Sequence, residues 1–283
     1  MTIRINKPEL WISSFPIPSK TDHKYSRGMV LINCGLKSKT GAARLAARSA
    51  MRVGAGAVKI VCDQSTVDIL EPQISVELID VANNKQEFQN ILKDKKITSA
   101  LIGPGNGIGD ETKARALMAL AFIDHVVLDA DALTVFANNP EELFIDCYPH
   151  TILTPHEGEF KKIFGNKIND IEDRVLKTSE AAKISNTIVV LKGADTIIAS
   201  PRGDVVINKS SAAYLATAGS GDVLAGIIVS LVGKNKMAAF DAACAGVWLH
   251  SQIGEILGAG MIAEDIIDLI PITIKKLIKF ELS

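Results

Sequence analysis

The stretch "TAGSGDVLAGIIVSLVG", residues 217–233, places glycines on both sides of a serine and an aspartate and then runs directly into an apolar segment. That segment is typical of a buried helix and is far shorter than the roughly 20 residues that a membrane-spanning helix needs. If the helix begins between Ser220 and Asp222, the backbone amides of Gly219, Ser220 and Gly221 form a cradle for an anion at the positive end of the helix dipole. The stretch therefore predicts phosphoryl chemistry, and the alternative role for Asp222 is a carboxylate that only stabilises the helix.

The expected role of Asp222 meets one physical objection. A helix N-terminus lowers the pKa of an aspartate, which weakens it as a base. In phosphoryl transfer through a loose transition state this matters less, because positioning and charge stabilisation carry most of the rate. We therefore expect Asp222 to act as a base toward a hydroxyl that attacks a phosphoryl group held by the same amides.

Upstream of this stretch, short apolar runs rich in β-formers alternate with helix-like segments, a pattern that predicts an α/β fold with a mostly parallel sheet between two helix layers. The expected strands are residues 29–34, 57–62, 99–103, 125–131, 151–155 and 187–193. The expected helices are residues 40–53, 110–123, 156–164 and 169–185. Two strand-like runs around "PRGD", residues 201–204, predict an antiparallel hairpin that ends the sheet. The chain beyond Gly219 is expected to be helical, with one helix starting at Pro271.

Composition limits the classes of partner. The 283 residues, 47% of them hydrophobic, can bury a large core, and since no repeat or Pro/Ser-rich linker interrupts them we expect one domain over residues 1–283. The 31 basic and 32 acidic residues form no long block of one sign, so small molecules are expected partners, whereas nucleic acid and membranes are not. The cysteines form no CxxC pair and the start carries no secretory apolar region, so we expect a cytoplasmic protein with buried free thiols.

Ligands of open parallel sheets bind at the carboxyl ends of the strands, and four consecutive strand ends here carry unusual residues. The loop "GPGNGIGD", residues 103–110, gives backbone amides close access to a phosphate or sugar, or is a plain turn in which Asp110 caps the next helix. The segment "DADAL", residues 129–133, ends the next strand.

The two remaining strand ends supply a histidine and a lysine. His156, in "LTPHEGEF", opens an acidic first helical turn, either as a site residue or as a tolerated histidine in a well-charged helix start. Lys192, beside Gly193, reaches either a polyphosphate or solvent.

Taken together and in order, these motifs resemble the ADP/ATP-dependent NAD(P)H-hydrate dehydratases, a family of the ribokinase-like superfamily that repairs hydrated nicotinamide cofactors. The matching segments are "HKYSRGMVLI" (23–32), "TGAARLAARSAMRVGAGAVKI" (40–60), "GPGNGIG" (103–109), "VLDADAL" (127–133), "LTPHEGEF" (153–160), "VLKGADTII" (190–198) and "ATAGSGDVLAGIIVSLVG" (216–233). The resemblance implies a ribokinase-like three-layer α/β/α fold. It also implies conversion of the S epimer of NADHX or NADPHX to NADH or NADPH, in which a phosphoryl group from ADP or ATP turns the ring hydroxyl into a better leaving group.

By position, the resemblance assigns residues to two ligands. The hydrated nicotinamide nucleotide would contact Ala43, Gly105, His156 and Asp222. The adenine nucleotide would be held by Lys192, Gly193, Ala194, Asp195 and Thr196, with Gly221 at its phosphates. Asp222 would assist the attack of the substrate hydroxyl, and Mg²⁺ would be the counter-ion of the phosphates, with no metal ligand assigned to the chain.

The chain departs from the family pattern at residues 33–35, where "NCG" replaces the usual glycine-serine pair after the first strand. Many bacterial members also carry an N-terminal epimerase domain, for which 283 residues leave no room, so the epimerase is expected to be a separate protein or to lie in a part of the protein outside this sequence. The apolar helices after Gly233 favour a homo-oligomer. Two other hypotheses stay open: a vitamin-precursor or sugar kinase with the same helix start, and a non-catalytic nucleotide-binding protein.

Overall fold

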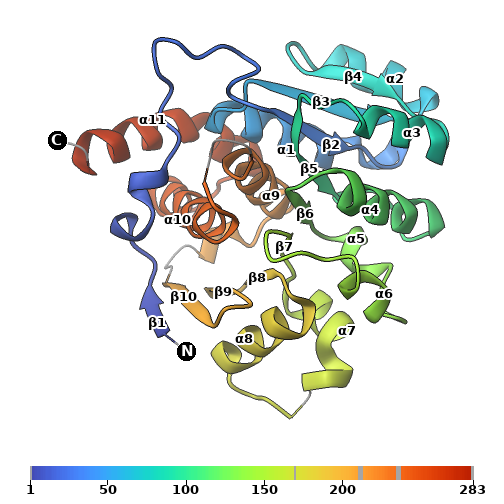
Figure 1. Cartoon of the computed structure of the whole chain (residues 1–283). Helices are drawn as coiled ribbons and strands as arrows, with labels where there is room; N and C mark the ends of the chain where they lie inside the picture. The colour runs from blue at the N-terminus through green and yellow to red at the C-terminus, as the bar shows by residue number, and fades with distance from the viewer. Residues whose placement is uncertain (1, 169, 210–212, 234–236, 282–283) are drawn as a thin grey trace.

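The computed structural model describes residues 2–168, 170–209, 213–233 and 237–281 (Figure 1). The described residues form a ten-stranded sheet in the order β1-β10-β9-β8-β7-β6-β5-β2-β3-β4, with helices on both faces (Figure 1). The predicted three-layer architecture with a mostly parallel sheet is confirmed.

The strands are short, and most lie inside the sheet. Their bounds are β1 Thr2–Ile5, β2 Met29–Asn33, β3 Ala57–Cys62, β4 Leu78–Val81, β5 Ile97–Ile102, β6 Val126–Leu128, β7 Ile152–Leu153, β8 Ile188–Leu191, β9 Asp195–Ala199 and β10 Asp204–Lys209. All five residues of β2 are buried, as are all four of β8, which explains why these strands read as unbroken apolar runs.

The helices connect the strands and then complete the chain. Their bounds are α1 Thr40–Val53, α2 Gln64–Leu70, α3 Lys85–Leu92, α4 Asp110–Phe122, α5 Asp131–Thr134, α6 Glu141–Phe144, α7 Glu157–Ile168, α8 Arg174–Ser185, α9 Ser220–Leu231, α10 Ala239–Leu257 and α11 Ala263–Glu281. Helix α1 has the predicted bounds. Among the described residues, none of the helices combines the length and apolar character that crossing a bilayer requires.

The edge of the sheet differs from the prediction. Strand β9 is antiparallel to β8 and β10, which confirms the hairpin, but β10 also pairs in parallel with β1, so the hairpin does not end the sheet. Strand β1 has only four residues, and its Ile3 and Ile5 are about half exposed, so no buried apolar run marks it in the sequence. Strand β4 was missed for the same reason.

The two faces of the sheet have separate hydrophobic cores. One core contains buried residues of α1, α9, α10 and α11, and the other contains buried residues of α3, α4, α7 and α8. Helices α1 and α9 approach closely, since a Cβ built on Gly226 would lie 2.1 Å from Oγ of Ser49 and 2.3 Å from the carbonyl oxygen of Ala46. Glycine at this position allows α9, which carries the predicted aspartate, to lie directly on α1.

The predicted helix start at Pro271 is wrong. Helix α11 begins at Ala263, and Pro271 lies inside it. Buried Ile266, Ile267 and Ile270 fix the preceding turns against the core, and this packing outweighs the cost of proline within a helix.

Candidate active site

The carboxyl ends of β5, β6, β7 and β8 form a continuous rim, because these strands are consecutive neighbours and run parallel. The expected convergence of four strand ends is confirmed. Helix α9 starts as predicted at Ser220, after Gly219 with φ +84°, and its first turn holds Asp222. A side chain in the left-handed region is strained, which accounts for glycine at the N-cap.

An ion pair between Lys192 and Asp129 lies on this rim. Nζ of Lys192 is 2.8 Å from Oδ1 of Asp129, whose side chain is only 2% exposed. Burial lowers the pKa of Lys192, but the carboxylates of Asp129 and Glu159 outweigh burial, so the pKa is raised and the lysine stays charged. A Cβ built on Gly221 would lie 3.6 Å from the same Nζ. Lys192 therefore brings a positive charge to the first turn of α9, beside the predicted anion cradle.

The pKa of Asp222 moves in the direction opposite to the one expected from its helix position. Burial, together with the carboxylate of Asp129, raises the pKa of Asp222 to about 6, against the opposing charge of Lys192. Desolvation and a like charge outweigh the dipole of α9, so the expected weakening of the base does not occur. A carboxyl group with this pKa can accept a proton near neutral pH.

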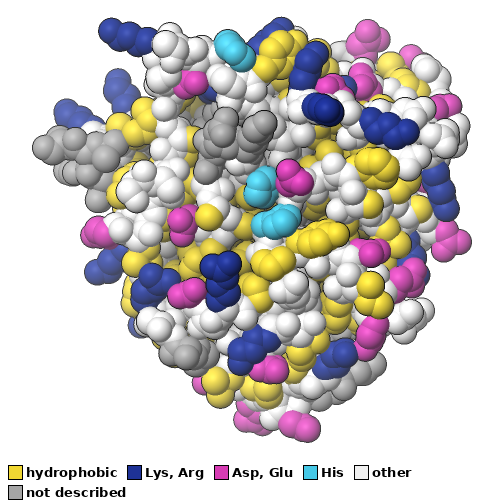
Figure 2. Space-filling model, viewed as in Figure 1, with side chains coloured by type: hydrophobic (Ala, Val, Ile, Leu, Met, Phe, Trp, Pro, Cys, Tyr) yellow, Lys and Arg dark blue, Asp and Glu magenta, His cyan; other side chains and the backbone are white. Residues whose placement is uncertain are grey.

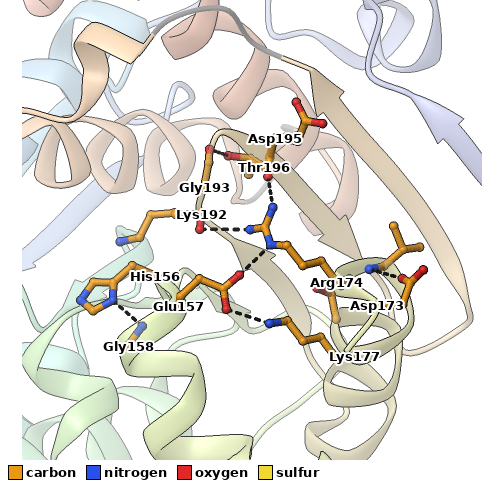
Figure 3. Close-up of polar contacts among 12 residues, drawn as sticks. His156, Glu157, Gly158, Asp173, Arg174, Lys177, Lys192, Gly193, Asp195 and Thr196 are labelled. Carbon is orange, nitrogen blue, oxygen red and sulfur yellow. Dashed lines mark hydrogen bonds and ion pairs between the residues drawn. The ribbon is translucent and has the colours of Figure 1, made fainter. Parts of the chain in front are cut away.

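His156 is held in place by its own helical turn. The amides of Gly158 and Glu159 donate hydrogen bonds to Nδ1 of His156 at 2.9 and 3.2 Å (Figure 3 draws the first). Since Nδ1 accepts, the proton of the neutral ring lies on Nε2, which is 3.3 Å from Oε1 of Glu159. The amide of His156 donates to Oε2 of Glu159 at 2.9 Å, which completes a capping box. The backbone of His156 also bridges to Lys192, so the histidine lies beside the ion pair.

The glycine-rich loop packs tightly against the segment after β2. A Cβ on Gly35 would lie 1.6 Å from the carbonyl oxygen of Gly105, and that same oxygen accepts a hydrogen bond from the amide of Leu36 at 3.1 Å. Gly105 itself has φ +67°, so both glycines are required by the local geometry. The alternative in which Asp110 caps the next helix is wrong in its position, because Gly109 is the N-cap of α4 and Asp110 is the first residue of that helix.

The departure from the family pattern at residues 33–35 has a structural role here. Nδ2 of Asn33 donates to Oδ1 of Asn106 at 2.7 Å, and Nη1 of Arg115 donates to Oδ1 of Asn33 at 2.9 Å. Nδ2 of Asn106 donates back to the Asn33 carbonyl at 2.9 Å, and the amide of Gly103 donates to Oδ1 of Asn106 at 2.9 Å. Asn33 therefore fixes the glycine-rich loop through a buried network.

The predicted nucleotide residues comprise the tight connection between β8 and β9 and the first two residues of β9. Gly193 and Ala194 are exposed at the tip of the connection, and Oγ1 of Thr196 donates to the carbonyl of Gly193 at 3.4 Å (Figure 3). We call Lys192, Gly193, Ala194, Asp195 and Thr196 the KGADT turn. Its exposed backbone is accessible to a ligand, while Lys192 at its start points to the ion pair with Asp129.

The structure thus brings Lys192, Gly221 and Asp222 together, with His156 next to them. Ala43 is placed differently: it lies in the first turn of α1 with 0% of its surface exposed. Its contact with the substrate stays a prediction, as do the ligand roles of the other residues.

Several residues that shape this rim were not predicted from the sequence. Asp129 was noted in "DADAL" without a role, although an acidic residue directly after a buried strand is a usable signal. The spacing of His156 and Glu159 follows a capping-box pattern, which could have identified Glu159. Buried His250 lies with Nε2 3.0 Å from Oγ of Ser220; burial lowers its pKa to about 4, so a neutral ring supports the start of α9.

These features define a protein of the ribokinase-like fold class, whose sheet rim meets a helix start with one aspartate. The family model described as NAD(P)H-hydrate dehydratase matches residues 30–271 of this chain. The chain belongs to the NAD(P)H-hydrate dehydratase family.

Individual proteins agree with this membership. An ADP-dependent (S)-NAD(P)H-hydrate dehydratase of Neisseria meningitidis is 34% identical over 269 residues, which are 89% of this chain and 86% of that protein. A bifunctional NAD(P)H-hydrate repair enzyme of Gloeobacter violaceus is 34% identical over 84% of this chain but only 47% of its own length. The chain thus spans about half of such bifunctional relatives. An ADP/ATP-dependent dehydratase of Bacillus subtilis, co-crystallised with ATP and Mg²⁺, has a TM-score of 0.82 at 26% identity, covering 98% of this chain and 99% of that one.

Proposed function

We propose that this chain converts the S epimer of NADHX or NADPHX to NADH or NADPH, while ADP becomes AMP and phosphate or ATP becomes ADP and phosphate. The observation that carries the proposal is the position of Asp222, in the first turn of α9 beside the Lys192–Asp129 pair, in a chain of the dehydratase family. The names of the Neisseria and Bacillus relatives support the substrate and the nucleotide.

The residues of the rim divide the work of the reaction. Asp222 accepts the proton of the ring hydroxyl while the hydroxyl oxygen attacks the terminal phosphoryl group of the nucleotide. Lys192 and the amides at the start of α9 would stabilise the charge on the phosphoryl oxygens, in the position that an anion takes at a helix N-terminus. The phosphate then leaves the ring carbon and takes a proton from the neighbouring carbon, so that a carbon–carbon double bond forms and the dihydropyridine is restored. Water is thereby removed from the substrate and consumed by the nucleotide.

The proposal keeps the binding residues predicted from the sequence. Ala43, Gly105, His156 and Asp222 would contact the nicotinamide nucleotide. The KGADT turn and Gly221 would hold the adenine nucleotide through backbone amides and the Lys192 charge.

Mg²⁺ fits this site as a companion of the nucleotide. Within the described ranges, no group of three or more His, Cys, Asp or Glu side chains is placed to hold a metal ion, and Asp129 is already paired with Lys192. Mg²⁺ commonly keeps water and phosphate ligands instead of an all-protein cage. Bound with the nucleotide, it would neutralise phosphate charge.

Three further expectations belong to this proposal. A separate epimerase would supply the S epimer from the R epimer. The free thiols of Cys34, Cys62, Cys147 and Cys244 suit the cytoplasm, where thiols stay reduced. A homo-oligomer would have to use exposed apolar residues such as Ile256, Ile262 and Ile272, because most of α10 is buried within the chain itself.

The test distinguishes the dehydratase from a kinase, which would keep the phosphoryl group on its product. The protein is incubated with S-NADHX, Mg²⁺ and either ADP or ATP, and phosphorus NMR follows the phosphoryl group. We expect free phosphate in proportion to the NADH formed with at least one nucleotide. A stable phosphorylated product would support the kinase, and no nucleotide-dependent turnover would favour the non-catalytic binding protein.

A further inference from the structure

One arginine, Arg174, donates hydrogen bonds to two backbone carbonyls of the KGADT turn. Nη1 of Arg174 donates to the carbonyl of Asp195 at 2.7 Å, and Nη2 donates to the carbonyl of Lys192 at 3.4 Å (Figure 3). Arg174 is the first residue of α8 and follows Asp173, whose carboxylate accepts hydrogen bonds from the amides of Val175 and Leu176. The backbone that carries the guanidinium is therefore fixed by a capped helix start.

The shape of the turn is matched to this arginine. A Cβ built on Gly193 would lie 2.4 Å from Nη2 of Arg174 and 3.0 Å from its Cζ. The φ angle of Gly193 is not in the left-handed region, so backbone strain does not favour glycine here, and a Cβ at this position would displace the end of the Arg174 side chain. The guanidinium fills the space of the missing side chain.

The same guanidinium connects the turn to the start of α7. Nε of Arg174 is 2.6 Å from Oε1 of Glu157, the residue after His156, and the other carboxylate oxygen of Glu157 is 2.8 Å from Nζ of Lys177 (Figure 3). The side chain of Arg174 is 31% exposed and Lys177 has no contact with the turn among the described hydrogen bonds. Arg174 thus joins the predicted nucleotide turn to the helix that carries the predicted substrate histidine.

We propose that Arg174 is a positioning residue for nucleotide binding. It holds the KGADT turn in the conformation that receives the phosphates, and Glu157 orients its guanidinium. This inference rests on the proposed function, because it concerns the nucleotide of that reaction. A planar guanidinium donates in several directions at once, whereas a lysine ammonium on a flexible stem cannot take the same two carbonyls and the carboxylate in this geometry.

The experiment compares Arg174→Lys and Arg174→Met with Lys177→Met as a matched control. Each of the three variants removes a contact to Glu157, namely the guanidinium of Arg174 or the ammonium group of Lys177. Only the Arg174 variants also remove the hydrogen bonds to the carbonyls of the KGADT turn. Calorimetry measures the Kd of ADP and of ATP with Mg²⁺, and steady-state kinetics measures kcat at saturating nucleotide. We expect both Arg174 variants to raise the nucleotide Kd at least about tenfold, with kcat within about threefold of the wild type. Lys177→Met should leave the Kd within about twofold of the wild type.

Three outcomes would overturn the inference. If Arg174→Met does not fold, Arg174→Lys decides, because it keeps the charge and most of the packing. A nucleotide Kd raised by less than about tenfold in the folded Arg174 variants, or a kcat lowered by more than about threefold, would remove the positioning role. An equal weakening in Lys177→Met would assign the effect to the charge of Glu157 and not to the turn. A wild-type protein that binds neither ADP nor ATP would overturn both the proposed function and this inference. If the wild type binds nucleotide and the variants bind it equally well, only the inference fails.

Discussion

At the scale of single residues, the account depends on the protonation of Asp222. Its pKa lies at about 6, above the ordinary value of 3.8, because of burial and the neighbouring carboxylate of Asp129. The site therefore holds a carboxylate that gives up part of its hydration to become a stronger base.

Replacing this carboxylate should separate activity from stability. Asp222→Asn should lower kcat by about 100-fold or more, since the hydroxyl loses its proton acceptor. The folded protein holds a proton on Asp222 that the unfolded chain releases between about pH 4 and 6, so this residue makes stability fall as the pH rises through that window. The variant should therefore gain roughly 3 kcal/mol in the free energy of unfolding at neutral pH. Urea unfolding of both proteins at several pH values measures this gain. A difference in the free energy of unfolding between the two proteins that does not change between about pH 4 and 6 would contradict the raised pKa.

The pH dependence of turnover should report the same group. We expect kcat/KM for S-NADHX to fall with decreasing pH through an apparent pKa of about 6, as Asp222 becomes protonated. In Asp129→Asn this acid limb should move to lower pH, because a like charge is removed and Lys192 is freed to approach Asp222. The same variant should raise the nucleotide KM, since Lys192 loses the partner that orients it. An acid limb at the same pH in both proteins would rule out the coupling between Asp129 and Asp222.

At the scale of elements, the position of α9 depends on its contact with α1. Gly226→Ala should lower the free energy of unfolding by about 1–3 kcal/mol, because the added methyl group would overlap Ser49 and the backbone of Ala46. Gly41→Ala, in the first turn of α1, is the matched control: its Cβ would have no atom within 4 Å, so it should be neutral or stabilising by up to about 1 kcal/mol. Chemical denaturation measures the free energy of unfolding of both variants. Equal values would show that the contact between α1 and α9 has room for a methyl group at residue 226.

The same scale explains what the sequence could predict. The start of α9 and the bounds of α1 were predictable, because a glycine before an apolar run and an amphipathic period are local signals. The pKa of Asp222 was not predictable, since it depends on Asp129, which only the order of the strands brings near. Arg174 gave no local signal either, because its partners Glu157 and the KGADT turn belong to other elements.

At the scale of the whole molecule, a single sheet carries two cores on its opposite faces. Lys and Arg side chains are interspersed with Asp and Glu over the face in Figure 2, in agreement with the near-neutral net charge and the small-molecule partners expected from the sequence. The short strand β1 extends this sheet beyond the hairpin, and the nearby Trp11 is 1% exposed and packs on Trp248 of α10 at a ring separation of 5.7 Å. The segment before β2 is therefore part of the same folded unit.

This arrangement predicts one cooperative unfolding transition for the single domain expected over residues 1–283. Tryptophan fluorescence reports the contact of Trp11 with Trp248, and far-ultraviolet circular dichroism reports all helices, so the two signals should change at the same urea concentration. Separate midpoints would show that the segment before β2 or one of the cores unfolds independently.

The most direct test of the central claim is the recovery of reduced cofactor from its hydrate. Purified S-NADHX is mixed with the protein, Mg²⁺ and either ADP or ATP, and the near-ultraviolet absorbance of the dihydronicotinamide is followed, with Asp222→Asn as the control. We expect the absorbance to return only when nucleotide is present, and the rate of return with the Asp222→Asn protein to be lower by about 100-fold or more. No return of absorbance with either nucleotide, or equal rates in the two proteins, would contradict the central claim.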